Sequence, residues 1–348
     1  MWTRRVMAAL LTAPLLLTGV LPTAQASPDP KLTVTAVSLS RSSVVVSGLN
    51  LVPVTVTVKG GYDSTNPADE QLTLFVVLER TSGSGQYPYQ LSTNLPRTAG
   101  TVKNGTWSGP LYVPSTANGT WKVTGVRAGP YGIPGDMTDP TPFAGPALAV
   151  SGSHLPKLNA LVTPRVVPFG SPYTIKWAIT DSATGKPYGT RLTALLAIDN
   201  GCAEDAGGDV IRTDVNGLYT KQYRAADADS LNCLRITGKP VDIAGLGFAV
   251  ARPGIVAATP SRTSASVGTV VPVNGSVAGA PAGCPVGLQR LYGATRWRAV
   301  SAAKVRQSGR FTVNAQPAYK GLIPYRVYLP ACHRFQAGVS KVFYIRGL

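Results

Sequence analysis

The fold is decided by a short stretch that occurs once in each third of the chain: Asn104-Gly105-Thr106-Trp107-Ser108, Asn216-Gly217-Leu218-Tyr219-Thr220 and Ser308-Gly309-Arg310-Phe311-Thr312. Each copy joins a turn dipeptide to an aromatic residue two positions after the glycine. Asn-Gly and Ser-Gly accept the positive φ of a tight turn, and the aromatic side chain can then point into a core. The pattern predicts a β-hairpin that seeds a hydrophobic core in each of three modules.

The sequence between these stretches is typical of strands. The chain has 37 glycines and 29 prolines, which punctuate apolar runs such as Leu72–Leu78 and Tyr173–Ile179. Turn signals recur at intervals of about 8–12 residues, as in β-sandwiches. No window after residue 26 shows a convincing helical period. We therefore predict an all-β protein.

A second repeat sets the length of the modules. Thr163-Pro164 with Gly170 is matched by Thr259-Pro260 with Gly268, at offsets of 96 and 98 residues. One β-sandwich domain is about 100 residues long. We predict three tandem β-sandwich domains joined by short linkers into a semi-rigid rod, with boundaries at residues 31–150, 155–252 and 255–348.

The first 26 residues have the pattern of a cleaved signal peptide. Arg4 and Arg5 precede the apolar stretch Val6–Leu21, and Ala24-Gln25-Ala26 supplies a small-x-small cleavage site. A membrane anchor is the alternative, but Pro14 interrupts a stretch shorter than the roughly 20 apolar residues that span a bilayer. We expect a secreted, extracellular protein with no membrane span after cleavage.

Four cysteines agree with export to an oxidising compartment. They allow three connectivities, and we predict the one in which each disulfide stays inside one domain: Cys202–Cys233 with Cys284–Cys332. Closing loops of this size should stabilise each domain by about 3–4 kcal/mol. Zinc is the competing interpretation. The cysteine spacings are too long for it, and the two histidines, His154 and His333, do not complete a ligand set.

The charge of the last domain is one-sided. Residues 255–348 contain twelve Lys and Arg residues and no Asp or Glu. Such a surface suits anionic wall polymers, whose phosphates or carboxylates accept bidentate guanidinium contacts, although a solvated basic face without a partner is the alternative. Strand alternation places Arg296 and Arg298 on one face, with Trp297 opposite and inward. The candidate polymer-binding residues are Arg290, Arg296, Arg298, Lys304, Arg306 and Arg310.

Neither catalytic nor cofactor-binding motifs are present in the sequence. Two histidines leave little for a Ser-His-Asp arrangement, and Gly-x-Ser-x-Gly and His-Glu-x-x-His are absent. An acidic cluster around Cys202 could bind calcium, or its members could be solvated or pair with Arg191, Arg212 and Lys221. The cluster comprises Asp199, Glu204, Asp205, Asp209 and Asp214. We predict no enzyme activity, no cofactor and no resident metal, with calcium left open.

Aromatic residues of the first domain offer a second binding hypothesis. Tyr87-Pro88-Tyr89, Tyr112 and Tyr131 lie in or near loop-like stretches and could stack on sugars. The tryptophans are more typical of cores, and we expect Trp107, Trp121, Trp177 and Trp297 to be buried.

The turn and core motifs resemble Ig-like modules in secreted and surface proteins of high-GC Gram-positive bacteria. The last domain carries the resemblance in Val286–Arg290, Arg296–Val300 and Ser308–Phe311, the middle one in Ile179–Pro187 and Thr213–Gly217, and the first in Gly100–Trp107 and Asn118–Trp121. The resemblance implies three Ig-like sandwiches. It also implies a role as spacer, stalk or adhesive unit, often beside a catalytic domain, for which this chain has no remaining segment.

Together these patterns predict a secreted, non-enzymatic structural or binding protein of the cell surface. Its third domain would be retained on anionic cell-wall polymers. The alternative is a carbohydrate- or protein-binding protein that uses the aromatic loops of the first domain, and an unrecognised hydrolase is a third class. Nucleic acid suits the charge but not the expected location.

Overall fold

The computed structural model describes residues 28–85, 88–129, 140–199, 202, 207–239, 241–293 and 295–348. Strands account for the regular structure of these residues, apart from three short 3-10 turns: η1 (Pro67–Gln71), η2 (Ser115–Ala117) and η3 (Ala225–Asp229). None of the described segments forms a helix with the length and hydropathy to cross a membrane. The predicted all-β class is confirmed, whereas the predicted signal peptide lies outside the described residues.

The first pair of sheets encloses the largest hydrophobic cluster. Trp107 and Trp121 are fully buried in it, as predicted, and each indole N–H donates to a backbone carbonyl, that of Leu72 at 3.0 Å and that of Ala117 at 2.6 Å. The first sheet has the order β1 (Leu32–Leu39), β3 (Leu51–Tyr62), β7 (Gly105–Pro114), β6 (Arg97–Gly100). The second has the order β2 (Ser43–Ser47), β10 (Ala147–Ser153), β8 (Gly119–Ala128), β4 (Leu74–Ser82), β5 (Tyr89–Leu91), and β9 (Thr141–Pro142) pairs with β8.

The second pair of sheets is centred on Trp177, which is also buried as predicted. Its indole N–H donates to the Tyr223 hydroxyl at 3.1 Å, and Tyr223 stacks on Tyr173. One sheet has the order β11 (Pro156–Thr163), β12 (Tyr173–Asp181), β15 (Leu218–Tyr223). The other has the order β14 (Asp209–Arg212), β13 (Thr193–Asp199), β16 (Leu231–Thr237), β17 (Asp242–Phe248).

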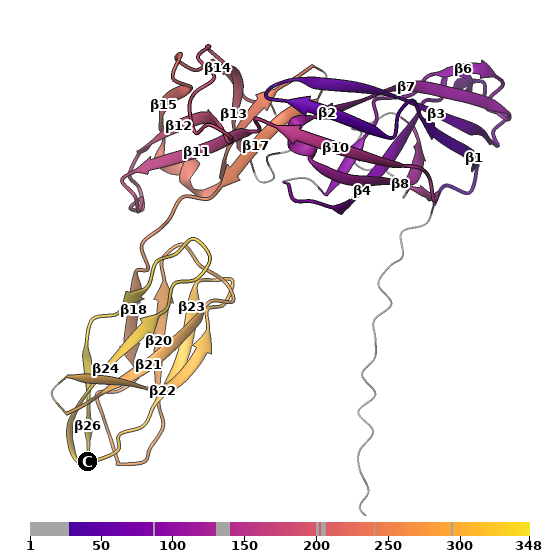
Figure 1. Ribbon diagram of the computed structural model, residues 1–348. Helices are drawn as coiled ribbons and strands as arrows, with labels where there is room; N and C mark the ends of the chain where they lie inside the picture. The colour runs from indigo at the N-terminus through magenta and orange to yellow at the C-terminus, as the bar shows by residue number, and fades with distance from the viewer. Residues whose placement is uncertain are drawn as a thin grey trace, which may run out of the picture.

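The third pair of sheets is packed around Phe311 and Tyr325 and lies at an angle to the first two in Figure 1. Its smaller sheet has the order β18 (Val256–Pro260), β20 (Val271–Val277), β23 (Arg310–Ala315). The larger has the order β19 (Ser264–Ala265), β26 (Phe343–Gly347), β24 (Gly321–Leu329), β21 (Pro285–Tyr292), β22 (Arg296–Lys304), and β25 (Gly338–Val339) pairs with β24. Strands β10 and β17 end at Ser153 and Phe248, close to the predicted boundaries. The division into three domains stays a prediction.

The three repeated turns differ from the predicted hairpins. Only the first lies in a hairpin, β6–β7, and there Gly100 rather than Gly105 has positive φ, at 76°. Gly217 and Gly309 have the expected positive φ, 72° and 75°, but their turns lead from one sheet to the other. The hairpin prediction is therefore wrong for the second and third copies. A turn dipeptide specifies the local reversal of the chain and not the sheet that the next strand joins.

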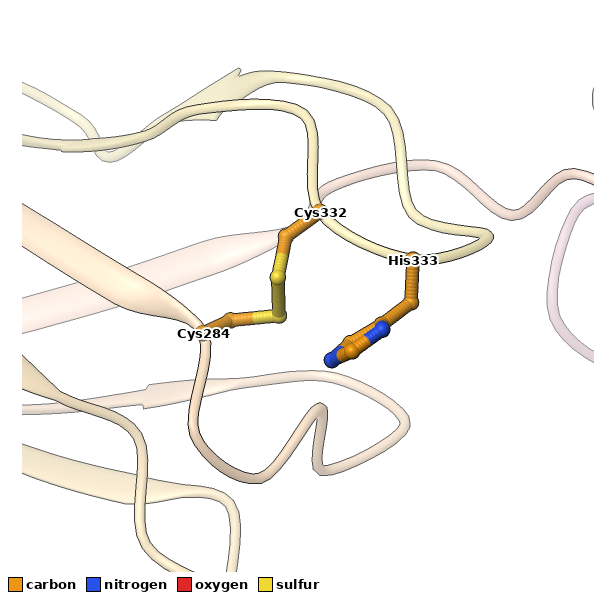
Figure 2. A group of neighbouring side chains, drawn as sticks. All are labelled: Cys284, Cys332 and His333. Carbon is orange, nitrogen blue, oxygen red and sulfur yellow. A yellow bond between two sulfur atoms is a disulfide. The ribbon is translucent and has the colours of Figure 1, made fainter.

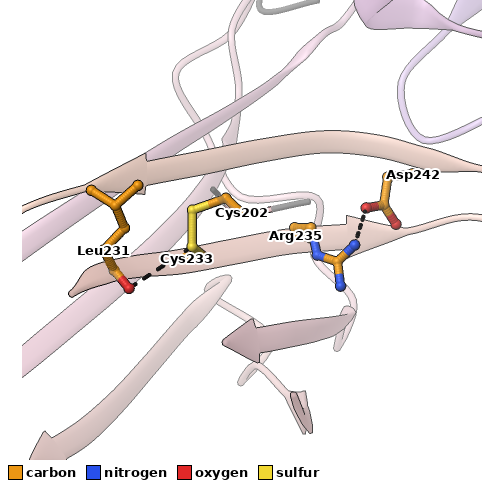
Figure 3. The surroundings of a disulfide bond; sticks show 5 residues. All are labelled: Cys202, Leu231, Cys233, Arg235 and Asp242. Atoms are coloured by element: carbon orange, nitrogen blue, oxygen red, sulfur yellow. Dashed lines mark hydrogen bonds and ion pairs between the residues drawn. A yellow bond between two sulfur atoms is a disulfide. The ribbon is translucent and has the colours of Figure 1, made fainter. Parts of the chain in front are cut away.

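Both predicted disulfides are present, Cys202–Cys233 and Cys284–Cys332. Figure 3 shows the first near a buried ion pair, in which Arg235 Nη1 lies 3.0 Å from Asp242 Oδ2. Burial raises the pKa of Asp242, and Arg235 opposes that shift. The disulfides are consistent with an extracellular or surface protein.

His333 approaches the second disulfide, as Figure 2 shows. The two sulfurs are bonded to each other, so neither can act as the thiolate ligand that zinc requires. This group is therefore no zinc site while the disulfide is intact.

Candidate anion-binding surface

The third module, residues 255–348, carries positively charged side chains that form almost no ion pairs in the described part of the chain. Among its twelve Lys and Arg residues, Arg334 alone lies within 4.0 Å of a carboxylate in the described part of the chain, and that carboxylate, Asp229, belongs to the preceding module. The other eleven cations have no carboxylate at that distance among the described residues. Their positive charge is therefore available to an external anion.

Two of the predicted residues contact one aromatic ring, and a third lies opposite it on the neighbouring strand. Arg290 pairs with Arg298 across β21 and β22, and Arg296 pairs with Tyr292. The guanidinium carbons of Arg290 and Arg298 lie 4.4 Å and 4.9 Å from the centre of the Tyr292 ring, and Arg290 also donates to the Tyr292 hydroxyl. Cation–π contacts hold these side chains against the ring and reduce the entropy that they lose on binding.

Trp297 is not a core residue, so its predicted inward orientation is wrong. A β-bulge interrupts the pairing of β21 with β22, where Leu288 faces Ser301 but Gln289 faces Ala299. The extra residue, Val300, reverses the alternation along β22. Trp297 therefore shares the outer face of the sheet with Ala299 and is only half-buried.

Arg326 completes this end of the sheet and was not among the predicted site residues. Its guanidinium lies over the Trp297 ring at 4.3 Å, and its Nε donates to Gln289 Oε1 at 2.8 Å. The alternation of Tyr325–Leu329 could have identified it, because Tyr325, Val327 and Leu329 are buried in β24 and Arg326 lies between two of them.

Lys304, Arg306 and Arg310 lie at the opposite end of β22. Val305 is buried between the exposed Lys304 and Arg306, and the Arg306 N–H donates to the Arg310 carbonyl at 2.9 Å in the turn that leads to β23. A strand rises about 3.3 Å per residue, so roughly 26 Å of β22 separates Arg296 from Lys304. The six predicted residues therefore form two basic clusters rather than one face.

The described members of the acidic cluster have protein partners. Asp209 pairs with Lys221, whose hydrogen bond and charge hold the pKa of that carboxyl below its usual range. Asp214 Oδ1 accepts the backbone N–H groups of Asn216 and Leu218 at 2.9 Å and 2.8 Å, which fixes the turn before β15. The Asp199 side chain, Glu204 and Asp205 lie outside the described residues, so the calcium hypothesis stays a prediction.

The aromatic residues of the first module are not brought together. Tyr89 is 57% exposed on β5, whereas Tyr112 lies within β7 in the opposite sheet. Tyr87 and Tyr131 lie outside the described residues. The two described tyrosines therefore do not form a common stacking platform, and Tyr112 lies near the end of its strand rather than in a loop.

No family model matches the sequence, and no curated protein matches it. Among solved structures, the chain is similar to the adhesin InvE of Yersinia pseudotuberculosis, with 9% identity over 54% of this chain and 58% of that chain and a TM-score of 0.28. It is also similar to the Escherichia coli adhesin FdeC, with 14% identity over 92% of this chain and 99% of that chain and a TM-score of 0.29. The Salmonella alpha-2-macroglobulin shares 11% identity over 92% of this chain and 24% of that chain, with a TM-score of 0.22. The chain thus spans less than two thirds of the InvE and macroglobulin structures, and likenesses of this strength assign it neither a family nor a partner.

Proposed function

We propose that this chain is a secreted, non-enzymatic binding protein of the cell surface whose third module binds anionic wall polymers. The observation that carries the proposal is the set of eleven cations in that module without a carboxylate within 4.0 Å in the described residues. Unpaired guanidinium groups bind phosphate and carboxylate oxygens in bidentate geometry, and a surface of one sign raises the local concentration of polyanions.

The two basic clusters suit a polymer better than a small anion. They lie at opposite ends of β22, so a flexible chain of repeating negative charges can contact both at once. Each contact is weak in water, but linking them raises the overall affinity through effective concentration. The Arg290–Tyr292–Arg298 cluster is the stronger half of the proposed surface, because its guanidinium groups are already positioned.

The experiment is co-sedimentation of the exported chain, residues 27–348, with isolated Gram-positive cell walls across a salt series. We expect binding at low ionic strength that is lost at about 0.5 M salt, because salt at that concentration screens the attraction between surface charges beyond a few ångströms. The triple variant Arg296→Gln, Arg298→Gln, Arg306→Gln should bind at least tenfold more weakly.

The matched control removes the same charge from the first module. Arg41, Lys59 and Lys122 are exposed, and replacing all three with Gln should leave binding close to that of the unmodified chain. Equal losses in the two triple variants would show that net charge alone drives retention. Absence of binding at low salt would refute the proposal.

A further inference from the structure

The second module contains an open hollow of about 540 Å³ beside the turn that connects β14 to β15. We call it the middle hollow; it is lined by Lys176, Arg191, Arg212, Thr213, Asp214, Leu218, Tyr219 and Thr220. Small-molecule sites commonly have volumes of about 300–1,000 Å³. The middle hollow therefore has the capacity for a ligand the size of a sugar.

Three cations from different parts of the module converge on the middle hollow. Lys176 comes from β12, Arg191 from the segment before β13, and Arg212 from the end of β14. All three residues are exposed, and none has a carboxylate within 4.0 Å in the described part of the chain. Three positive charges against the one negative charge of Asp214 leave the lining with an excess of positive charge, which attracts an anion.

The acidic residue in the lining, Asp214, forms no ion pair with these cations within 4.0 Å, and its carboxylate leaves the lining with two net positive charges. Asp214 Oδ1 is directed to the backbone N–H groups of Asn216 and Leu218 within its own turn. Asp209, the nearest described acid on β14, pairs instead with Lys221. Because Asp214 fixes the turn, this part of the lining is formed before any ligand arrives.

The remaining lining residues suit a ligand with a carbon framework. Tyr219 is half-buried against the core and brings an aromatic ring and a hydroxyl to the middle hollow, and Leu218 adds an aliphatic surface. The exposed Thr220 hydroxyl provides a hydrogen-bonding group. An aromatic ring beside hydroxyl groups is a common surface for the apolar side of a sugar or polyol.

We infer that the middle hollow binds the phosphate ester of a sugar or polyol unit. Two guanidinium groups can form bidentate hydrogen bonds to phosphate oxygens, and Lys176 supplies a third positive charge. A phosphate monoester carries close to two negative charges at neutral pH, which matches three cations better than the single charge of a carboxylate does. The site is independent of the basic clusters of the third module.

The test is isothermal titration calorimetry at low ionic strength on residues 27–348 with glucose 6-phosphate, inorganic phosphate and glucose. We expect one glucose 6-phosphate per chain, weaker binding of inorganic phosphate and no measurable binding of glucose. The variant Arg191→Gln, Arg212→Gln should weaken glucose 6-phosphate binding at least tenfold. The matched control, Arg41→Gln with Lys59→Gln, removes two exposed charges of the first module and should bind it as the unmodified chain does.

Four results would overturn the inference in whole or in part. Absence of stoichiometric binding, or equal losses in the two double variants, would refute the site. Equal affinity for glucose 6-phosphate and glucose would refute the role of the phosphate. Equal affinity for inorganic phosphate and glucose 6-phosphate would refute the contact with the sugar. Retention on cell walls depends on the third module, so it can fail or succeed separately from each of these results.

Discussion

The two junctions between the modules are built from different forces. At the first, Leu49 and Leu51 of the first module pack against the hydrophobic cluster of the second, and the Thr116 hydroxyl donates to the Ile243 carbonyl. At the second, the side-chain ion pairs and hydrogen bonds are made by two arginines, Arg252 and Arg334, and the Phe169 ring of the second module lies against Gly279 of the third. The first junction extends a hydrophobic core, whereas the second combines one aromatic contact with the group Arg252, Arg334 and Asp229, which we call the polar clasp.

The polar clasp has a fixed geometry. Arg252 is 1% exposed, and its Nη2 lies 2.9 Å from Asp229 Oδ1 while its Nη1 donates to the Pro168 carbonyl at 3.1 Å. Arg334 reaches the same Asp229 oxygen at 3.1 Å and donates to the Ala228 carbonyl at 2.8 Å. Apolar packing tolerates small displacements, whereas these hydrogen bonds require specific distances and angles. The difference predicts that salt and single polar substitutions affect the second junction far more than the first.

The largest effect is expected from Arg252→Met. The substitution removes a buried guanidinium that donates to two carbonyls and a carboxylate and lies 4.9 Å from the Phe169 ring centre. Lost charge-assisted hydrogen bonds and unsatisfied carbonyls should lower the free energy of unfolding by about 3 kcal/mol. Urea denaturation measures this loss, and Arg252→Lys should recover only part of it because an ammonium lacks the planar fork. A loss within experimental error would show that the clasp does not contribute to stability.

A smaller loss is expected from Leu51→Ala at the first junction. Leu51 is half-buried against the second module, so the substitution should cost about 1–2 kcal/mol, below the range for fully buried leucines. Because the contact is apolar, the difference in free energy should not change between low and high salt. Leu161→Ala, at a position that is 63% exposed, is the control and should be nearly neutral. A strong salt dependence of the Leu51 loss would remove the distinction between the two junctions.

Asp229→Asn tests the shared acceptor of the polar clasp. Asp229 is 63% exposed, and exposed ion pairs contribute about 1 kcal/mol or less, so the stability change should be small. The arrangement of the modules should respond more, because one carboxylate oxygen accepts from both arginines. Small-angle X-ray scattering should show a broader distribution of dimensions for the variant. The unmodified chain should approach that distribution at high salt, and identical curves at all salt concentrations would contradict the polar clasp.

The sequence predicted features that depend on local pattern and composition. The all-β class, both cysteine pairs and the burial of Trp107, Trp121 and Trp177 followed from alternation, spacing and residue type. Features that depend on three-dimensional neighbours were missed. The bulge at Val300 reversed the direction of Trp297, and nothing in the β22 sequence marks it. Arg252 and Arg334 meet Asp229 from 23 and 105 residues away, and the middle hollow joins residues of several strands.

The smallest expected effect is a pH dependence at the rim of the first junction. Asp181 Oδ2 lies 2.8 Å from His154 Nδ1, and Oδ1 accepts the Ala183 N–H at 2.8 Å. The hydrogen bond from His154 holds the pKa of Asp181 below its usual range, with the Ala183 and Thr184 hydrogen bonds acting in the same direction. An acid with a lowered pKa in the folded state contributes stability above its unfolded pKa of about 3.9, and that contribution is lost as pH falls through the folded value.

We therefore expect the urea concentration at the unfolding midpoint of the unmodified chain to decrease once the pH is below about 4. The substitution Asp181→Asn should make that decrease smaller. The difference between the two proteins should be largest near neutral pH and should shrink as the solution becomes acidic. Asp63→Asn is the matched control, because Asp63 is 85% exposed and lies 3.4 Å from an exposed lysine, Lys103. If Asp181→Asn and the unmodified chain lose stability in parallel down to low pH, the His154–Asp181 contact does not stabilise the first junction. That junction would then rest on the apolar contacts of Leu49 and Leu51 and on neutral hydrogen bonds, which would make its contrast with the polar clasp complete.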